Sequence, residues 1–320
     1  MTQALPSNLR GALTALAAFA IYAVHDALIK SLGANYSAFQ IVFFSVLFGF
    51  PLTTLMLIRD RTDGNLRPRR PMWTVLRTVF TVIATLSVFY AFSALPLAQT
   101  YAILFSMPLI ISLVAVPILG ERIGWRRGIA ILVGLGGVMA VLRPGTTDLT
   151  LGHAAALSAA VFLSLISVIL RKIGHEERSA VLVLYPMLAN FIVMGCILPF
   201  VYVPVAPADM AGMAALAALA VVALLVQIQA YKMSRAVIVA PMQYSQIIWA
   251  TLFGALFFDE VPDLNTAIGA AIIIGSGVYI VLREDGATGS GTPVLKTQSR
   301  FGPIPLTRIS LLQRFGRKSD

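Results

Sequence analysis

A stretch at residues 98–143 decides the fold, and it reads AQTYAILFSMPLIISLVAVPILGERIGWRRGIAILVGLGGVMAVLR. Its apolar runs predict one helix over 98–119 and a second over 125–142. A Gly-Glu-Arg turn at 120–122 separates them. The same plan returns from Val237 onward, so the stretch occurs twice in the chain.

The two copies match residue by residue at a constant offset. At an offset of 139, six residues meet an identical or similar partner: Phe105 and Tyr244, Ser106 and Ser245, Ser112 and Thr251, Leu113 and Leu252, Ala115 and Gly254, Glu121 and Glu260. Two more residues enter the second turn, and at an offset of 141 three glycines follow in register: Gly128 and Gly269, Gly134 and Gly275, Gly136 and Gly277. This agreement indicates an internal duplication.

The composition indicates a protein that is dissolved in lipid. Of 320 residues 58% are hydrophobic and only 12% are charged, which is too little polar surface to cover a globule in water. The net charge of +10 does not indicate nucleic-acid binding, because the basic residues lie between apolar segments and form no recognition motif. The single cysteine, Cys196, excludes an intramolecular disulfide.

Ten segments have the roughly 20 apolar residues that a membrane span requires. They are residues 11–30, 39–58, 73–93, 96–119, 124–142, 151–170, 180–203, 210–231, 236–258 and 264–282. Because each copy contains an odd number of spans, the second copy must enter the membrane from the opposite side. We therefore expect an all-α integral membrane protein of ten transmembrane helices, arranged as two inverted five-helix repeats.

The distribution of basic residues predicts the orientation. With the N-terminus inside, 21 of the 24 Lys and Arg residues fall on the cytoplasmic side, and only Lys30 and Arg143 fall outside. Arg77 lies within the third span. We expect a multi-pass protein of the cell inner membrane with both termini in the cytoplasm.

Four regions follow from this map. Residues 1–10 form the cytoplasmic N-terminus, 11–142 the first five-helix repeat, 150–283 the second, and 284–320 a basic cytoplasmic tail that is expected to be disordered. Within the tail, Leu306 to Lys318 alternates apolar and basic residues and could lie on anionic lipid, although a solvated tail is the favoured interpretation.

The chain resembles the drug/metabolite transporter superfamily, specifically its EamA-type ten-helix members. The resemblance rests on residues of both halves: Ala94-Leu95-Pro96, Pro108, Gly120-Glu121-Arg122, Pro241, Asp259-Glu260 and the duplicated glycines. It departs at Ile247, where a proline matching Pro108 would be expected, and at Asp259, which replaces a glycine. The resemblance implies a basket of ten helices with a central substrate cavity and alternating access.

Asp26 is the most informative single residue, since a carboxylate inside a span costs about 2.5 to 3.5 kcal/mol on insertion scales. Tyr22, Asp26 and Lys30 share one helix face, so an Asp26–Lys30 ion pair is the favoured interpretation. The alternative makes Asp26, with His25 beside it, a protonatable coupling site or the counter-charge of a cationic substrate.

Three other charged residues allow two interpretations each. Glu121 and Glu260 end equivalent helices on opposite sides of the membrane, where helix capping and interfacial ion pairs with neighbouring arginines are favoured over a gating role. Arg77 is expected to reach the lipid head groups and not to line a cavity. The duplicated glycines are expected to let the fifth and tenth helices approach a neighbour or a second copy closely.

Uncharged polar and aromatic side chains within the spans suggest a substrate site. Amides in hydrocarbon need partners and should face the bundle interior, where some only tie helices together. With Tyr22, His25, Asp26 and Lys30, the candidate substrate-binding or coupling residues are Tyr90, Gln99, Tyr101, Gln243, Tyr244, Gln246 and Trp249. Such a set suits a flat ring with a hydrogen-bonding edge, although each aromatic could equally belong to an interfacial belt.

Transport is the function that these features favour. A membrane enzyme is the main alternative, but the histidines are scattered and no metal-binding motif is present, so we expect no catalytic residues, metal or cofactor. The first helix, with Asp-Ala-Leu-Ile-Lys at 26–30, resembles uptake systems for S-adenosylmethionine and riboflavin as well as amino-acid exporters. We favour uptake of a ring-bearing cofactor or precursor over export of amino acids or drug-like metabolites. The expected partners are this small molecule, membrane lipid and, if transport is coupled, a proton. The chain is expected to be a monomer or a homodimer.

Overall fold

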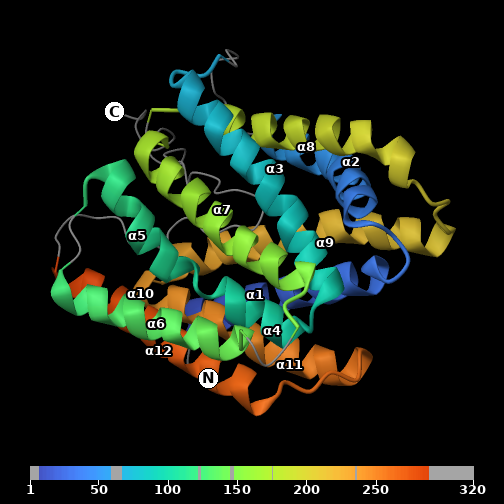
Figure 1. Ribbon diagram of the computed structural model, residues 1–320. Coiled ribbons are helices and arrows are strands. Elements are labelled where there is room, and N and C mark those ends of the chain that lie inside the picture. The colour runs from blue at the N-terminus through green and yellow to red at the C-terminus, as the bar shows by residue number, and fades with distance from the viewer. Residues whose placement is uncertain are drawn as a thin grey trace, which may run out of the picture.

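A computed structural model describes residues 7–58, 67–121, 124–144, 148–174, 176–234 and 236–287. All regular elements within these ranges are helices (Figure 1). The first half contains α1 (Ser7–Gly33), α2 (Ala38–Ile58), α3 (Pro71–Ala94), α4 (Leu97–Leu104), α5 (Met107–Leu119) and α6 (Trp125–Leu142). The second half contains α7 (Leu151–Ile173), α8 (Ser179–Val201), α9 (Pro207–Met233), α10 (Ala236–Val239), η1 (Ala240–Ser245), α11 (Gln246–Phe257) and α12 (Leu264–Ala287).

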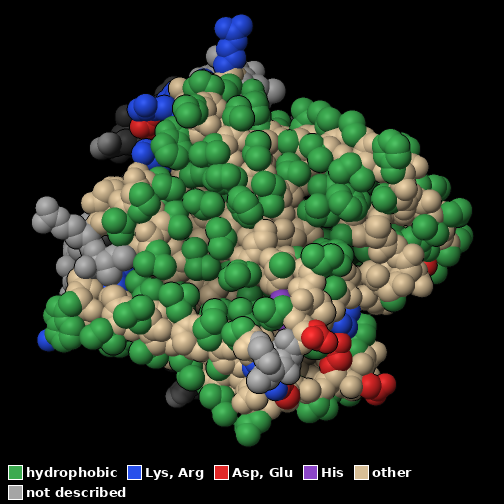
Figure 2. Space-filling model, in the orientation of Figure 1, with side chains coloured by type: hydrophobic (Ala, Val, Ile, Leu, Met, Phe, Trp, Pro, Cys, Tyr) green, Lys and Arg blue, Asp and Glu red, His purple; other side chains and the backbone are tan. Residues whose placement is uncertain are grey.

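Every predicted apolar segment is helical, and most are long enough to cross a bilayer. Seven helical stretches of the described chain meet the length and hydropathy of a span, with α4 and α5 counted together. Apolar stretches of α2 and α12, Ala38–Thr54 and Leu264–Ile280, are shorter. Hydrophobic side chains cover most of the face in Figure 2, while charged side chains gather near its upper left and lower right. Most of the predicted tail, including residues 306–318, lies outside the described residues, as does Arg122.

The fourth segment of each half was expected to be one continuous helix, but it is broken at an equivalent place in both halves. In the first half the break falls at Ser106, just before Pro108, which lacks the N–H that a continuous helix needs. In the second half the 3₁₀ turn η1 ends at Ser245, the partner of Ser106 at the offset of 139. Pro241 lies in the first turn of η1, so the second break exists although Ile247 replaces the matching proline.

The turn after each broken helix also has the same backbone conformation. Gly120 has a φ of +73°, and Asp259, its partner at the offset of 139, has a φ of +54°. Both values lie in the left-handed region, which glycine adopts freely and aspartate tolerates better than most residues. The replacement of glycine by Asp259 therefore changes the residue and keeps the turn.

Equivalent helices of the two halves exchange equivalent contacts. α1 packs along α9, and α3 packs along α7, while α2 packs on α8 and α6 on α12. The register agrees in detail: Gly11 of α1 lies against Ser234 at the end of α9, and Gly152 of α7 lies against Leu95 at the end of α3. Positions 11 and 152 are related by the offset of 141, and positions 95 and 234 by the offset of 139. The two halves thus build one bundle with the same pairwise packing (Figure 1).

The helices α6 and α12 run antiparallel and approach closely through glycine. Gly137 lies opposite Gly269 and Ile273, and Gly134 lies opposite Ser276, so residue numbers rise along one helix as they fall along the other. A Cβ at Gly137 would lie 2.9 Å from the Gly269 carbonyl oxygen. The glycine prediction is therefore right for the helix pair and incomplete in its residues. Gly137, which was not predicted, lies against Gly269, whereas Gly136 and Gly275 face open space.

Candidate functional site

A buried acidic cluster lies between α1 and α4. The Asp26 side chain is fully buried, and its Oδ1 lies 2.9 Å from Nδ1 of His25. The Tyr101 hydroxyl of α4 donates a hydrogen bond to Oδ2 of the same carboxylate. A neutral His25 with its ring proton on Nδ1 would donate to Oδ1 of Asp26, so this contact needs no extra proton. The carboxylate is therefore within hydrogen-bond distance of two polar side chains, those of His25 and Tyr101.

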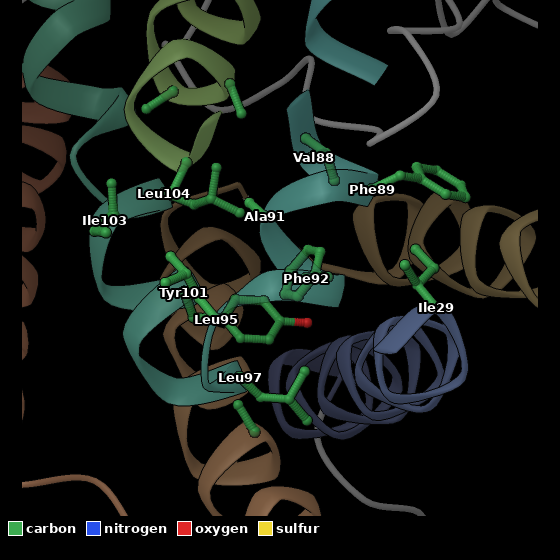
Figure 3. Packing of buried hydrophobic residues seen from close by; sticks show 14 of the residues in the cluster. Ile29, Val88, Phe89, Ala91, Phe92, Leu95, Leu97, Tyr101, Ile103 and Leu104 are labelled. Carbon is green, nitrogen blue, oxygen red and sulfur yellow. The ribbon is translucent and has the colours of Figure 1, made fainter. Parts of the chain in front are cut away.

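Aromatic rings surround this cluster and connect it to the second half. Phe89 packs edge-on against the His25 ring at 6.2 Å between centroids, and Phe92 packs against Tyr101 at 5.2 Å. Tyr101 is followed by Phe105 at 5.9 Å, and Phe105 packs against Tyr244 of η1 at 5.0 Å. Figure 3 shows the Tyr101 ring beside Phe92, with its hydroxyl directed toward α1. A row of rings thus links the buried carboxylate to the break in the second half.

Lys30 pairs with Glu260 and not with Asp26. Its Nζ lies 2.8 Å from Oε1 of Glu260 and donates to the Leu95 carbonyl oxygen at 2.7 Å. Oε2 of Glu260 accepts a hydrogen bond from the Leu97 N–H at 3.2 Å. The predicted Asp26–Lys30 pair is therefore wrong, because tertiary packing supplies each charge with a partner from another helix. The pair ties the end of α1 to the α3–α4 junction and to the loop after α11.

Glu121 also pairs with a distant helix. Arg171, in the last turn of α7, places Nη2 2.5 Å from Oε1 of Glu121. The predicted neighbours act elsewhere: Arg127 donates to Ser112 Oγ at 2.8 Å, and Arg126 lies over the Trp125 ring. The prediction of an ion pair at this helix end is right in kind, but its partner belongs to the second half.

The other candidate residues fall into four places. Tyr22 donates to Gln227 of α9 at 3.3 Å, one turn of α1 away from Asp26. Tyr90 is 38% exposed on the outside of α3, away from the cluster. The remaining candidates are Gln99, which lies 3.0 Å from His153, and four residues of η1 and α11: half-buried Gln243, Tyr244 and Trp249, and buried Gln246.

Three buried polar groups near the second break have no hydrogen-bond partner among the described residues: the hydroxyls of Tyr244 and Ser245 and the indole N–H of Trp249. Ser245 and Trp249 lie four residues apart, which puts them on one helix face. Buried polar groups are almost always satisfied, so these two donors are available to a bound molecule.

Arg77 does not lie at the lipid head groups, as was expected. Its guanidinium is fully buried and donates to the Leu182 carbonyl oxygen at 2.7 Å, while Nε and Nη2 have no partner among the described residues. The predicted position at the lipid head groups is wrong, because α3 packs on α8 at this level and leaves the side chain no route to the surface.

A cavity of about 330 Å³ lies near the Lys30–Glu260 pair. It is lined by residues of α4, α6, α7 and α12 and by the loop before α12, including Gln99, His153 and Thr266. At its edge Arg143 and Asp263 form an ion pair. Sequence reasoning missed His153, because no spacing connects it with Gln99.

One missed partner did have a signal in the sequence. At the offset of 141, Asp-Ala-Leu-Ile-Lys at 26–30 falls on Ser-Val-Ile-Leu-Arg at 167–171, with Gly11 on Gly152 and Gly33 on Gly174. Lys30 and Arg171 are therefore equivalent residues of the first and sixth predicted helices. The duplication extends to both ends of the chain's apolar part.

These features describe a helical membrane protein with a charged site held inside its bundle. Intramembrane charges of this kind mark substrate and ion pathways. The comparison with known families agrees: residues 9–143 and 150–283 both match the EamA-like transporter family, and the chain belongs to it. The family and the relatives below are transporters.

The relatives differ in what they carry. The chain is 24% identical to the S-adenosylmethionine uptake transporter of Rickettsia prowazekii over 284 residues, which cover 89% of this chain and 96% of the relative. It is 29% identical to the pseudopaline exporter CntI of Pseudomonas aeruginosa, over 82% of this chain and 93% of that one. It is 27% identical to the riboflavin transporter of Vibrio cholerae, over 86% and 94%. A chain of known crystal structure, 20% identical, matches 88% of this chain and 99% of its own length with a TM-score of 0.58.

Proposed function

We propose that this transporter carries a small ring-bearing metabolite across the inner membrane by alternating access. Ten spans in two inverted repeats, with both termini cytoplasmic, form the transport unit. The antiparallel packing of the duplicated helices α6 and α12 supports the inversion, and the excess of basic residues on one side supports the orientation. Inverted repeats give a bundle two equivalent packings, one open to each side.

The substrate site combines the acidic cluster with the row of rings. Asp26 carries the proposal, because a fully buried carboxylate needs a function or a partner that repays its cost. Rings from Phe89 to Tyr244 suit a flat heterocycle, and the free donors of Ser245 and Trp249 suit its polar edge. A sulfonium compound such as S-adenosylmethionine would also use the carboxylate as its counter-charge. We therefore place uptake of an S-adenosylmethionine-like or riboflavin-like cofactor first.

Export is the second candidate for direction. One relative, at 29% identity, is the pseudopaline exporter. The carboxylate and rings would serve either direction, because the direction follows from gradients and coupling. Transport assays in right-side-out and in inside-out vesicles distinguish uptake from export.

Purified protein in liposomes tests the proposal. We expect labelled S-adenosylmethionine or riboflavin to cross faster than through empty vesicles, and to be competed by the unlabelled compound. Amino acids serve as the comparison class. The proposal of a ring-bearing substrate fails if only amino acids cross.

Asp26→Asn separates a coupling role from a structural one. If Asp26 carries the coupling proton or the counter-charge, the variant loses accumulation driven by a pH gradient or loses affinity for the cationic substrate. Asp209→Asn is the matched control, because it removes a carboxylate that also accepts a hydrogen bond from a tyrosine, Tyr36, outside the candidate site. Unchanged accumulation with an unchanged pH dependence would remove Asp26 from the mechanism.

A reporter fused after residue 283 tests the orientation and should be cytoplasmic.

A further inference from the structure

Two ion pairs occupy equivalent positions in the two halves. The offset of 141 relates Lys30 to Arg171, and the offset of 139 relates Glu121 to Glu260, as for the duplicated helices. The structure joins them crosswise: Lys30 of α1 with Glu260 after α11, and Arg171 of α7 with Glu121 after α5. Each pair therefore connects the first helix of one half to the fourth helix of the other.

The two pairs lie at opposite ends of the bundle. Lys30 donates to the carbonyl oxygen of Leu95, directly after the last residue of α3. Lys172, next to Arg171, lies over the ring of Trp73 in the first turn of α3, at 4.3 Å from its centroid. The stretch of α3 from Trp73 to Leu95 spans about 33 Å of helix, which is the thickness of a bilayer core. One pair is therefore near each membrane surface.

Both pairs are formed in this structure, and neither is fully solvated. The side chains are 12% and 22% exposed in the Lys30–Glu260 pair and 20% and 31% exposed in the Arg171–Glu121 pair. The arginine–glutamate pair between Arg70 and Glu176 is more open, at 58% and 47%. Partial burial gives the first two pairs more electrostatic weight than a surface pair, and still leaves them weak enough to separate.

We propose that these pairs are the two gates of the transport cycle, and this rests on the proposed function. Lys30–Glu260 closes the access on one side and opens in the state that faces that side, while Arg171–Glu121 closes the other. An ion pair that exists in only one of two states biases their equilibrium by its own free energy. Because the pairs are equivalent and opposed, loss of one must bias the bundle in the direction opposite to loss of the other.

The test measures access to a reporter cysteine from each side. Cys196 is the single cysteine and is exposed, so Cys196→Ala gives a background without reactive thiols. Ser245→Cys, at the break before α11, then reports access to the interior. An impermeant maleimide is applied to right-side-out and to inside-out vesicles that contain the full chain.

We expect Glu260→Gln to raise labelling about two- to tenfold from one side and to lower it from the other. Glu121→Gln should give the reverse pattern. Glu176→Gln removes a comparable pair at the same end as Glu121 and should change neither rate. The gates are refuted if both variants raise labelling from the same side, if neither changes it, or if Glu176→Gln has an equal effect.

A charge exchange keeps the test decisive if a single variant folds poorly. Lys30→Glu with Glu260→Lys restores an ion pair of reversed polarity and should return labelling toward the parent pattern. As a second measurement, cross-linking Lys30→Cys to Glu260→Cys should block labelling from one side only. If the cross-linked protein is labelled equally from both sides, the Lys30–Glu260 pair is not a gate. Labelling needs no substrate, so opposite responses without any transport would count against the proposed function alone.

Discussion

The contact between α6 and α12 gives a quantitative test of the antiparallel packing. A methyl group added at Gly137 would lie 2.9 Å from the Gly269 carbonyl oxygen and 2.9 Å from Ile273 Cγ1. Added at Gly269, it would lie 2.5 Å from Val141 Cγ2 and 2.7 Å from the Gly137 carbonyl oxygen. Carbonyl oxygens of two helix backbones cannot move aside separately, so α6 and α12 must separate. Overpacking of this kind costs about 1–3 kcal/mol.

The same helices supply matched controls. Gly136 and Gly275 have no atom within 4 Å of an added Cβ. Alanine at any of the four positions gains the same helix propensity, about 1 kcal/mol relative to glycine. The difference between Gly137→Ala and Gly136→Ala therefore isolates the overpacking cost, and the same holds for Gly269→Ala and Gly275→Ala.

The unfolding free energy of each variant is measured by titration with a denaturing detergent in mixed micelles. We expect Gly137→Ala and Gly269→Ala to be less stable than their controls by about 1–3 kcal/mol. The double variant should cost less than the sum of the two, because one separation of the helices relieves both clashes. Equal stability of Gly137→Ala and Gly136→Ala would refute the close antiparallel contact, and with it the main support for inverted repeats.

Four further outcomes follow from single contacts. Asp259→Gly should stabilise the protein by up to about 1 kcal/mol in the same titration, because its φ of +54° strains any residue with a Cβ. Tyr101→Phe should destabilise it by about 1–3 kcal/mol, since a buried oxygen of the Asp26 carboxyl group loses its hydrogen-bond donor. Arg77→Met should be neutral or stabilising, as the guanidinium keeps buried N–H groups without partners among the described residues, and a loss of stability would contradict this. The hydrogen bond from Arg70 lowers the pKa of Glu176 below 4.5, so the small stability that this exposed pair provides should be complete above pH 4.5, fade as the pH falls through the lowered pKa, and be absent in Glu176→Gln.

The sequence predicts the scaffold well because the scaffold is periodic and repeated. Apolar runs long enough to cross a bilayer identify the helical segments, and the offset of 139 identifies the equivalent turns at Gly120 and Asp259. The breaks at Ser106 and Ser245 were not predicted, because an apolar run does not show where a helix is interrupted. Asp259 shows why the offset is a better guide than residue identity. It replaces glycine, yet it adopts the left-handed conformation of Gly120 because the surrounding repeat requires that turn.

The partners of charged residues are less predictable, because they come from distant helices. Spacing along α1 suggests that Asp26 and Lys30 pair, but each finds a better-placed group elsewhere in the chain: Tyr101 of α4 for Asp26, and Glu260 of the loop after α11 for Lys30. Arg77 is similar: its distance from the helix end suggests lipid, and packing against α8 decides otherwise. Only the duplication carries long-range information of this kind, since it identifies Arg171 as the counterpart of Lys30.

The two halves of the chain also differ at the position of the buried carboxylate, Asp26. The position equivalent to Asp26 is Ser167, which is buried and donates a hydrogen bond within its own helix, to the Leu163 carbonyl oxygen. The carboxylate of the acidic cluster therefore has no counterpart at the equivalent position, whereas the ion pairs at the two ends exist in both halves. Alternating access needs equivalent closures on the two sides, but a single substrate molecule needs only one set of binding groups. Under the proposed function, the two equivalent ion pairs would serve the motion, and the single carboxylate at Asp26 would serve binding. On this reasoning Ser167→Asp should disturb the bundle without creating a second transport site.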